Sequence, residues 1–409
     1  MAGRRSDAKT TLVLHVDLNR TCLMSDSSGN RSMEDTLNYL LSEVSYGSRC
    51  AASGWAPKSA AQPSSVKPES SSLINVSYKT FVDQKYPFAS DKAGSPAAVE
   101  LNRAAKAARQ IAQNTFTHRG QPGELHAPTF NALLARMHFP ETRKSAAVAA
   151  STTLAPGLLA DTWAVGRYFL LPSYLELLLH LQESHLLDQV RIVYRTYGQD
   201  LEEVAKELDM FAAGQHPLFP EKSLDPRLTL RRPFSSFYRH GPRSCDALIA
   251  VGTMERSNEL VGVDLDSFYA IRQVQTVKGF PQISDAMNKM LAEAPNRCLG
   301  LRDHYNWWQM NGESDDSGKL LLLPTAAIAQ TIENNDDGDL IRHCFIDDHI
   351  EHNRAHIVDV RCSTSAGACV PFEESINRWI FRAEPFDAIL DRNYFVKLVR
   401  RIMGVHMMT

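Results

Sequence analysis

Residues 13–23 read VLHVDLNRTCL, an apolar run that ends in Asp17 and is followed at alternate positions by Asn19 and Thr21. A continuous apolar run of this length is typical of a parallel strand that is buried on both faces. We therefore predict a buried strand over residues 11–17 with Asp17 at its carboxyl end. An aspartate at that place either caps the strand or serves as a nucleophile, and the rest of the chain has to decide between the two.

The same strand pattern returns four times further along the chain. The four short apolar runs are residues 190–196 (VRIVYRT), 297–302 (RCLGLR), 343–347 (HCFID) and 356–360 (HIVDV). Helical patterns stand between or beside them, over residues 33–44, 174–187 and 284–294. Alternating strands and helices predict an α/β fold, namely a Rossmann-like, doubly wound parallel sheet with helices on both faces.

A long segment between the first and second strands interrupts this alternation. Residues 48–72 are rich in Ser, Ala and Pro and are expected to form a mobile loop, because they cannot bury enough apolar surface by themselves. A helix is predicted over the Ala-rich residues 97–113, and weaker helical patterns follow at 129–138 and 157–167. We therefore divide the chain into an α/β core (1–46 and 161–409) and a partly helical insertion (47–160).

Composition narrows the class of protein. The chain has 409 residues, of which 44% are hydrophobic, and a formal net charge of -3. A charge so close to zero gives no general basic field, so we expect neither nucleic acid nor an anionic membrane as a partner. Seven cysteines without CxxC spacing indicate a reducing compartment, and no apolar stretch approaches membrane-spanning length. We therefore expect a cytoplasmic protein, and leave its oligomeric state open.

Chemically active side chains stand at the predicted strand ends, where ligands bind in sheets of this kind. The first strand ends in Asp17, the second in Thr196 and the fourth in the pair Asp347 and Asp348, while Lys319 lies in the predicted loop between the third and fourth. These are the groups that a magnesium-dependent phosphoryl transfer through an aspartyl-phosphate requires. One Mg²⁺ together with Lys319 would balance the charge of the three carboxylates.

The neighbouring residues are assigned supporting roles. Mg²⁺ prefers oxygen ligands, so the backbone carbonyl of Asn19 is expected to complete the carboxylate set. Thr196 would donate a hydrogen bond to a phosphoryl oxygen, as would backbone N–H groups of the loop that ends at Thr21. Arg20 and Arg195 border these positions and would either meet a substrate anion or form ordinary ion pairs.

These positions resemble the sequence motifs of the haloacid dehalogenase superfamily. The first motif, DxDx[TV], is similar to DLNRT from Asp17 to Thr21, and the second, a strand that ends in Ser or Thr, is similar to VYRTYG with Thr196. The third, a lysine, is similar to SGK with Lys319, and the fourth, an acidic pair, is similar to CFIDD at residues 347–348. The motifs occur in the family's order.

The resemblance covers about residues 10–46 and 173–365. It implies a phosphatase-type hydrolase that uses Mg²⁺ and a nucleophilic Asp17, with a phosphorylated small molecule or a phosphoprotein as substrate. The insertion falls where the family often carries a cap domain over its active site.

One residue departs from the family pattern. Phosphatases of the superfamily use a second aspartate, two residues after the nucleophile, as general acid and base, and this chain has Asn19 there. An amide does not titrate near neutral pH, so a factor of 10² to 10⁴ in rate, about 3 to 5 kcal/mol of barrier, is left unsupplied. The alternatives are a slow phosphatase limited to good leaving groups, an enzyme with other chemistry, or a binding or scaffold protein.

Three further features are weighed against these motifs. Residues 260–267 (LVGVDLDS) imitate the first motif but lack the companion strands, so we expect a hairpin or turn there. Four histidines between residues 343 and 356 match no zinc pattern, although His349 follows the acidic pair directly. Trp307 and Trp308 either form an aromatic wall of the substrate pocket or anchor their loop to the core.

Overall fold

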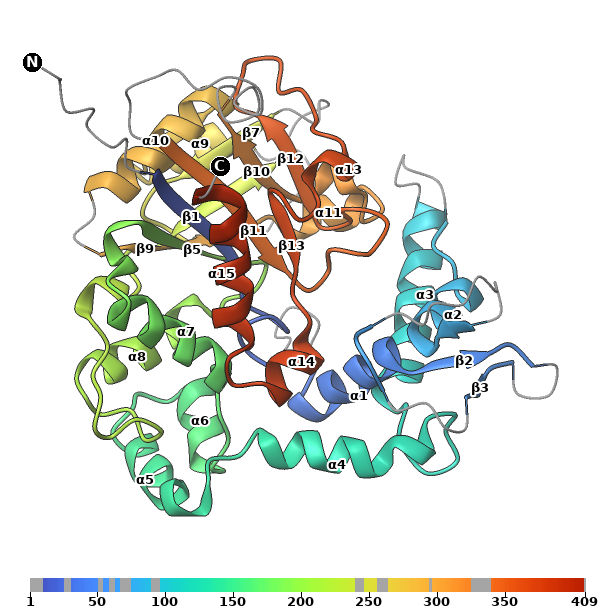
Figure 1. Cartoon of the computed structure of the whole chain (residues 1–409). Helices are drawn as coiled ribbons and strands as arrows, with labels where there is room; N and C mark the ends of the chain where they lie inside the picture. Colours follow the sequence, from blue (N-terminus) through green and yellow to red (C-terminus); the bar gives the residue numbers. More distant parts are fainter. Residues whose placement is uncertain are drawn as a thin grey trace, which may run out of the picture.

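The computed structural model describes residues 10–25, 31–50, 54–58, 63–66, 75–89, 96–239, 246–255, 264–293, 296–324 and 340–407. Its centre is an eight-stranded sheet with the strand order β13-β11-β1-β5-β9-β6-β7-β8 (Figure 1). The strands are β1 (Thr10–Asp17), β5 (Val190–Thr196), β6 (Ser235–Arg239), β7 (Ala247–Ala250), β8 (Thr276–Lys278), β9 (Cys298–Arg302), β11 (Leu340–Asp347) and β13 (Ile380–Arg382). The predicted α/β fold is therefore confirmed.

The sheet is mixed rather than wholly parallel. The strands from β13 to β6 pair in parallel, whereas β7 pairs antiparallel with both β6 and β8. The link between β6 and β7 spans only residues 240–246, which is too short for the crossover that parallel strands need. The predicted run at 356–360 forms part of β12 (Val358–Cys362), which pairs with β10 (Lys319–Leu323) in a separate two-stranded sheet.

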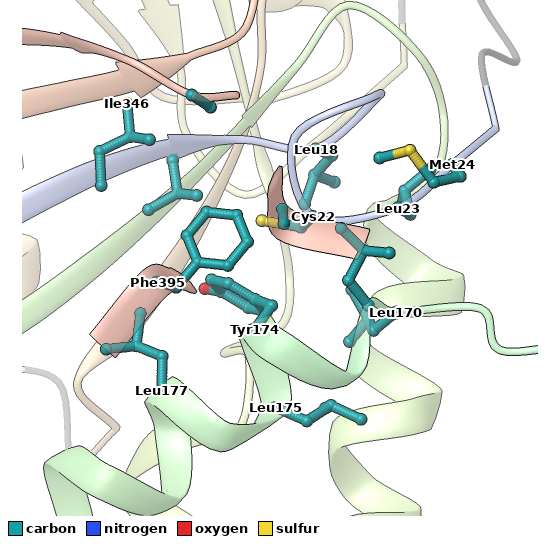
Figure 2. Packing of buried hydrophobic residues seen from close by; sticks show 14 of the residues in the cluster. Leu18, Cys22, Leu23, Met24, Leu170, Tyr174, Leu175, Leu177, Ile346 and Phe395 are labelled. Carbon is teal, nitrogen blue, oxygen red and sulfur yellow. The ribbon is translucent and has the colours of Figure 1, made fainter. Parts of the chain in front are cut away.

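Helices cover both faces of the central sheet. Leu12, Leu14 and Val16 of β1 point into one core with α7 (Pro172–Glu183) and α15 (Tyr394–Met407), where Tyr174, Ile346 and Phe395 pack together (Figure 2). Val13 faces the opposite core, which contains α10 (Phe280–Glu293). Because successive residues of a strand point to opposite faces, β1 is buried on both sides as predicted.

The three helices predicted in the core are confirmed as α1 (Met33–Val44), α7 and α10, the last two with bounds shifted by a few residues. Helix α1 (Met33–Val44) begins with a capping box in which Ser32 and Asp35 bond each other's backbone N–H. The N-cap of α9 is Asp264, so the part of the 260–267 segment that is described begins a helix instead of a hairpin, and residues 260–263 lie outside the described residues. The other helices of the core are α8 (Leu201–Ala212), α9 (Leu265–Ile271), α11 (Tyr305–Met310), α13 (Phe372–Ser375), α14 (Pro385–Leu390) and the 3₁₀ turns η2 (Leu186–Asp188), η3 (Pro226–Leu228) and η4 (Asp315–Ser317).

The described part of the insertion has regular secondary structure beyond the predicted helices. It contains a three-stranded antiparallel sheet and a set of helices, which Figure 1 shows beside and below the central sheet. Its elements are β2 (Tyr46–Ser48), β3 (Ala56–Pro57), β4 (Asn75–Ser77), α2 (Tyr78–Lys85), α3 (Pro96–Asn114), η1 (Glu124–His126), α4 (Ala127–Arg136), α5 (Glu141–Ser151) and α6 (Leu158–Ala164). The predicted helix over 97–113 is confirmed as α3.

The segment 48–72, predicted to be a mobile loop, contains a residue that is firmly packed. Trp55 is 1% exposed and packs against Tyr78 at 5.1 Å and Phe116 at 6.0 Å between ring centroids. One large aromatic ring supplied the apolar contact that a composition average over the whole segment concealed. Residues 51–53, 59–62 and 67–72 of that segment lie outside the described residues.

Candidate active site

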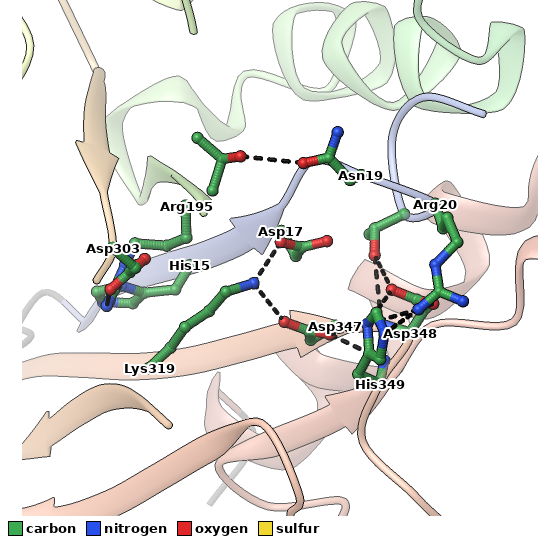
Figure 3. Close-up of polar contacts among 12 residues, drawn as sticks. His15, Asp17, Asn19, Arg20, Arg195, Asp303, Lys319, Asp347, Asp348 and His349 are labelled. Carbon is green, nitrogen blue, oxygen red and sulfur yellow. Dashed lines mark hydrogen bonds and ion pairs between the residues drawn. The ribbon is translucent and has the colours of Figure 1, made fainter. Parts of the chain in front are cut away.

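The carboxylates of Asp17 and Asp347 lie beside each other at the carboxyl ends of the adjacent parallel strands β1 and β11. Val16 pairs with Ile346 in the sheet register, so the two strand-end aspartates follow at neighbouring positions. Lys319 joins them, because its Nζ donates a hydrogen bond to Asp17 and another to Asp347 Oδ2 at 2.9 Å (Figure 3). The structure therefore brings these three predicted site residues into direct contact.

The prediction that Lys319 lies in a loop is wrong, because Lys319 is the first residue of β10. Gly318 precedes it, and a Cβ there would lie 2.2 Å from the carbonyl oxygen of Ile357. Only glycine allows so close an approach of the two backbones. The Gly-Lys sequence thus lets β10 begin against β12 and directs the ammonium group to the aspartates.

The cluster is buried and carries more negative charge than Lys319 balances. Lys319, Asp17 and Asp347 are at most 3% exposed. Burial raises the pKa of the Asp17 carboxyl well above its usual range, and Asp347 and Asp348 raise it further, while Lys319 opposes this effect. Asp17 and Asp347 in turn raise the pKa of Lys319 in spite of its burial, so that it stays protonated. A further cation near Asp17 would favour its ionised, nucleophilic form.

Asp348 has its own cation in Arg20. Arg20 Nη2 lies 3.1 Å from Asp348 Oδ2, and the His349 ring lies 3.2 Å from the other carboxylate oxygen. Burial disfavours an ionised Asp348, but Arg20 and His349 outweigh it and hold the pKa of that carboxyl far below its usual range. The Thr21 hydroxyl accepts a hydrogen bond from the backbone N–H of Asp348 at 3.2 Å. Thr21 therefore ties the first motif to the acidic pair.

Asp347, Asp348 and His349 form a group that could hold a metal ion. Carboxylate and imidazole atoms of Asp347, Asp348 and His349 lie within 4.8 Å of one another. Hard cations such as Mg²⁺ prefer carboxylate oxygens. Both oxygens of Asp347 already accept hydrogen bonds, one from Lys319 and one from the His349 backbone N–H at 2.9 Å. Of the predicted metal ligands, Asp347 and Asp348 belong to this group, whereas Asp17 contacts Lys319 and is not part of it. Arg20 would compete with a metal for Asp348.

Asn19 and Thr196 bond to each other. Thr196 Oγ1 donates to Asn19 Oδ1 at 3.0 Å, and Asn19 Nδ2 donates to Asp200 Oδ2 at 3.1 Å and to the Ser25 carbonyl oxygen at 3.3 Å. Because an ionised carboxylate only accepts hydrogen bonds, Asp200 fixes which end of the amide faces it. The Thr196 oxygen also accepts from the Gly198 N–H at 2.8 Å. Thr196 therefore holds Asn19 in this structure and is not among the residues that line the cavity described below.

Arg195 is not brought to this site. Its guanidinium pairs with Asp303, with Nε 2.9 Å from Oδ2, and also donates to the Leu320 carbonyl oxygen at 3.2 Å. The side chain is completely buried. Neighbouring residues of a strand point to opposite faces, so Arg195 cannot share the direction of Thr196. Its predicted contact with a substrate anion is not supported, and its position makes it a structural ion pair.

A cavity of about 460 Å³ opens above the cluster. Its floor includes Asp17, Asn19, Arg20, Lys319 and His349. Helices α2 and α3 of the insertion line the same cavity. Seven Lys or Arg residues face four Asp or Glu residues in the lining, so the described walls favour an anionic ligand. The cavity side chains to which the sequence analysis assigned no role in the site include Arg31, Tyr39, Lys79, Asp83, Lys106, Arg109, Tyr197, Tyr305, Glu351 and Arg354.

The structure shows which of the tryptophans and histidines singled out in the sequence lie at the cavity. Trp308 lines the cavity and also ties α11 to the core, since its indole N–H donates to the His356 carbonyl oxygen at 3.4 Å. Trp307 is not among the lining residues. His349 and His356 line the cavity. His343 is buried in the sheet, where it bonds His15 at 3.0 Å between ring nitrogens.

Comparisons with known proteins identify no relative: no protein-family model matches the chain, and no match was found among curated proteins or solved structures. Within the described residues, no helix is both long and apolar enough to cross a membrane. The assignment of chemistry therefore rests on the geometry of the site.

Proposed function

We propose that this chain is a phosphate-ester hydrolase of the haloacid dehalogenase type, with Asp17 as the nucleophile and Mg²⁺ as its cation. The observation that carries the proposal is the bridge from Lys319 to both Asp17 and Asp347 on the floor of a basic cavity. The sequence separates Lys319 from Asp17 by 302 residues, and a structural ion pair alone would not require a cavity above it.

The first step of the proposed reaction is attack of an Asp17 oxygen on phosphorus. The new bond is an aspartyl-phosphate anhydride, and the bond that breaks joins phosphorus to the ester oxygen. Lys319 keeps the Asp17 carboxylate oriented and offers N–H donors to a phosphoryl oxygen. Mg²⁺ would be held by the carboxylates of Asp17, Asp347 and Asp348 and the backbone carbonyl of Asn19, and when bound it would neutralise charge on the phosphoryl oxygens.

Proton transfer is the weak part of this site. Asn19 cannot protonate the leaving alkoxide, and its amide is already held by Thr196 and Asp200. Esters with good leaving groups need no such proton, so we expect them to react fastest. Hydrolysis of the aspartyl-phosphate by water then returns free Asp17 and phosphate.

A second candidate is a phosphate-ester binding protein without turnover. It is favoured by two contacts: the locked amide of Asn19 and the guanidinium of Arg20 on Asp348. Both would leave anion binding at Lys319 intact while lowering the rate of the chemical steps.

The test is hydrolysis of 4-nitrophenyl phosphate by the full chain, with and without Mg²⁺. We expect metal-dependent turnover that falls at least about 100-fold in Asp17→Asn and is unchanged in Asp266→Asn, a control whose side chain is 50% exposed and lies outside the cavity lining. If the parent shows no turnover, calorimetry with inorganic phosphate decides between the candidates. Binding that disappears in Lys319→Met establishes the second candidate, and no binding at all refutes both.

A further inference from the structure

One wall of the cavity is aromatic. Tyr197 follows β5 directly, and Tyr305 and Trp308 lie on α11 after β9. The Tyr197 ring stacks on Trp308 with 5.6 Å between centroids and 19° between planes, and it meets Tyr305 at 5.4 Å. All three rings line the cavity. Such a surface favours contact with a planar, apolar group more than with a flexible polar one.

This wall runs from the proposed phosphate site to a cation of the insertion. Lys319 Nζ lies 4.9 Å from the centre of the Tyr197 ring on the floor. At the other end, Lys106 Nζ lies 4.9 Å from the centre of the Tyr305 ring and donates a hydrogen bond to its hydroxyl. Lys106 belongs to α3 of the insertion and Tyr305 to α11 of the core, and both line the cavity. Two ammonium groups therefore stand at opposite ends of a row of rings.

Lys106 differs from the other insertion cations that line the cavity. Lys79 and Arg109 each pair with Asp83, at 3.1 and 3.3 Å. Among the described residues, no carboxylate lies within ion-pair distance of Lys106, whose hydrogen-bond partner is the neutral hydroxyl of Tyr305. A half-buried ammonium group with a neutral partner has lost part of its hydration without gaining a counter-ion. An anionic group of a ligand would supply that counter-ion.

We propose that the cavity selects a phosphate monoester whose organic part contains a planar ring that bears a second anionic group. The phosphate lies against Asp17 and Lys319, the ring lies along Tyr197 and Tyr305, and the second anion contacts Lys106. The cavity volume of about 460 Å³ is in the range of small-molecule sites. This inference rests on the proposed function, because it takes the phosphate end of the cavity as given.

Three ligands of graded chemistry test the inference by isothermal titration calorimetry in Mg²⁺. Ribose 5-phosphate has no ring base, uridine 5′-monophosphate adds a planar ring, and orotidine 5′-monophosphate adds a carboxylate to that ring. We expect the ring to tighten binding about three- to tenfold and the carboxylate to tighten it about fivefold more. Phosphorus NMR of each titrated solution reports whether the ester was consumed.

Matched variants test whether Lys106 causes the gain in affinity that the carboxylate provides. In Lys106→Met the two nucleotides should bind equally, with the affinity for uridine 5′-monophosphate retained within about twofold, which also shows that the cavity is intact. Lys106→Arg should keep the preference for the carboxylate. The control is Arg103→Met on the same helix, whose side chain is 76% exposed and outside the cavity lining, and it should behave as the parent does.

Several results would overturn the inference. If ribose 5-phosphate binds and the two nucleotides bind no more tightly, the phosphate site stands and the ring and anion subsites are wrong. If the carboxylate preference survives in Lys106→Met, the second anion lies elsewhere. If none of the three ligands binds although 4-nitrophenyl phosphate is hydrolysed, the proposed function stands and this inference is wrong; if neither binding nor hydrolysis is seen, the proposed function fails with it.

Discussion

The contact between Asn19 and Asp200 changes what an apparently restoring substitution should do. Replacing Asn19 by Asp restores the carboxylate that the superfamily motif has at this position. In this structure, however, the amide nitrogen lost in Asn19→Asp is the group that donates to Asp200 at 3.1 Å. A carboxylate oxygen would take its place and face a second carboxylate.

The size of the penalty follows from the distance. Two unit charges about 3 Å apart repel by about 5 kcal/mol at the effective dielectric constant of about 20 that suits protein sites. Protonating one carboxyl at pH 7 costs about 4 kcal/mol, because pH 7 lies about three units above its ordinary pKa. The folded variant takes the cheaper route, so we expect a loss of about 4 kcal/mol in the free energy of unfolding at pH 7. The folded pair binds its proton with a raised pKa, so this loss grows as pH rises and shrinks to about 1 kcal/mol at pH 5.

Exchanging the two side chains removes the repulsion. In the double variant Asn19→Asp/Asp200→Asn, an amide at position 200 donates to a carboxylate at position 19, and the Thr196 hydroxyl can still donate to that carboxylate. We expect urea unfolding at pH 7 to place the double variant within about 1 kcal/mol of the parent. It should also hydrolyse alkyl phosphates about 10²-fold faster than the parent, because the new carboxyl can act as acid and base. Asp200→Asn alone is the control.

Either of two results would refute this reasoning. If the Asn19→Asp variant is as stable as the parent at both pH 7 and pH 5, the side chains of residues 19 and 200 are not in contact. A double variant no more stable than Asn19→Asp would mean that the loss has another cause.

Three further outcomes are expected. Arg20→Ala leaves Asp348 without its buried counter-ion, so the free energy of unfolding should fall by about 3 to 5 kcal/mol. Mg²⁺ should restore this stability, so the urea midpoint of the variant should rise with metal concentration far more than that of the parent. Lys319→Met should cost a similar amount and abolish phosphate binding in calorimetry, whereas the exposed control Lys289→Met should do neither. Burial lowers the pKa of His343 to about 4 from an ordinary value near 6.5. The neutral form therefore stabilises the fold fully above pH 6.5, and this contribution is lost as pH falls toward 4. His343→Gln should reduce the dependence of the free energy of unfolding on pH between 4 and 6.5, and an unchanged slope would contradict the assignment.

The sequence was most informative where local and long-range requirements coincide. The run that ends in Asp17 had to be a strand buried on both faces, and Asp347 ends a run of the same kind, so their meeting at one sheet edge followed from parallel pairing. The Gly318-Lys319 pair was identified from its spacing, although its placement on a strand depended on β12, whose pairing no local pattern specifies. Trp55 was missed because a composition average does not show which single side chain finds a partner.

The partners of the motif residues were the least predictable part of the site. Asp200 stands four residues after Thr196, at the start of the next helix, and that position was a usable signal, since residues that follow a strand end lie near its carboxyl edge. The pairing of Arg195 with Asp303 could have been suspected from strand alternation. No pattern in the sequence placed Lys106 opposite Tyr305, because that contact depends on how the insertion packs on the core.

Because the floor of the cavity is formed by residues far apart in the sequence, ligand binding can be measured through the stability of the folded chain. Asp17 and Lys319 are 302 residues apart along the chain and meet only when β1, β10 and β11 are all in place. An unfolded chain therefore presents no version of this site, and a compound that occupies it stabilises the native state alone. At one hundred times its dissociation constant such a compound adds about 2.7 kcal/mol to the free energy of unfolding. The melting temperature of the unmodified chain is thus a direct screen for its natural ligand, and Lys319→Met provides the matched blank.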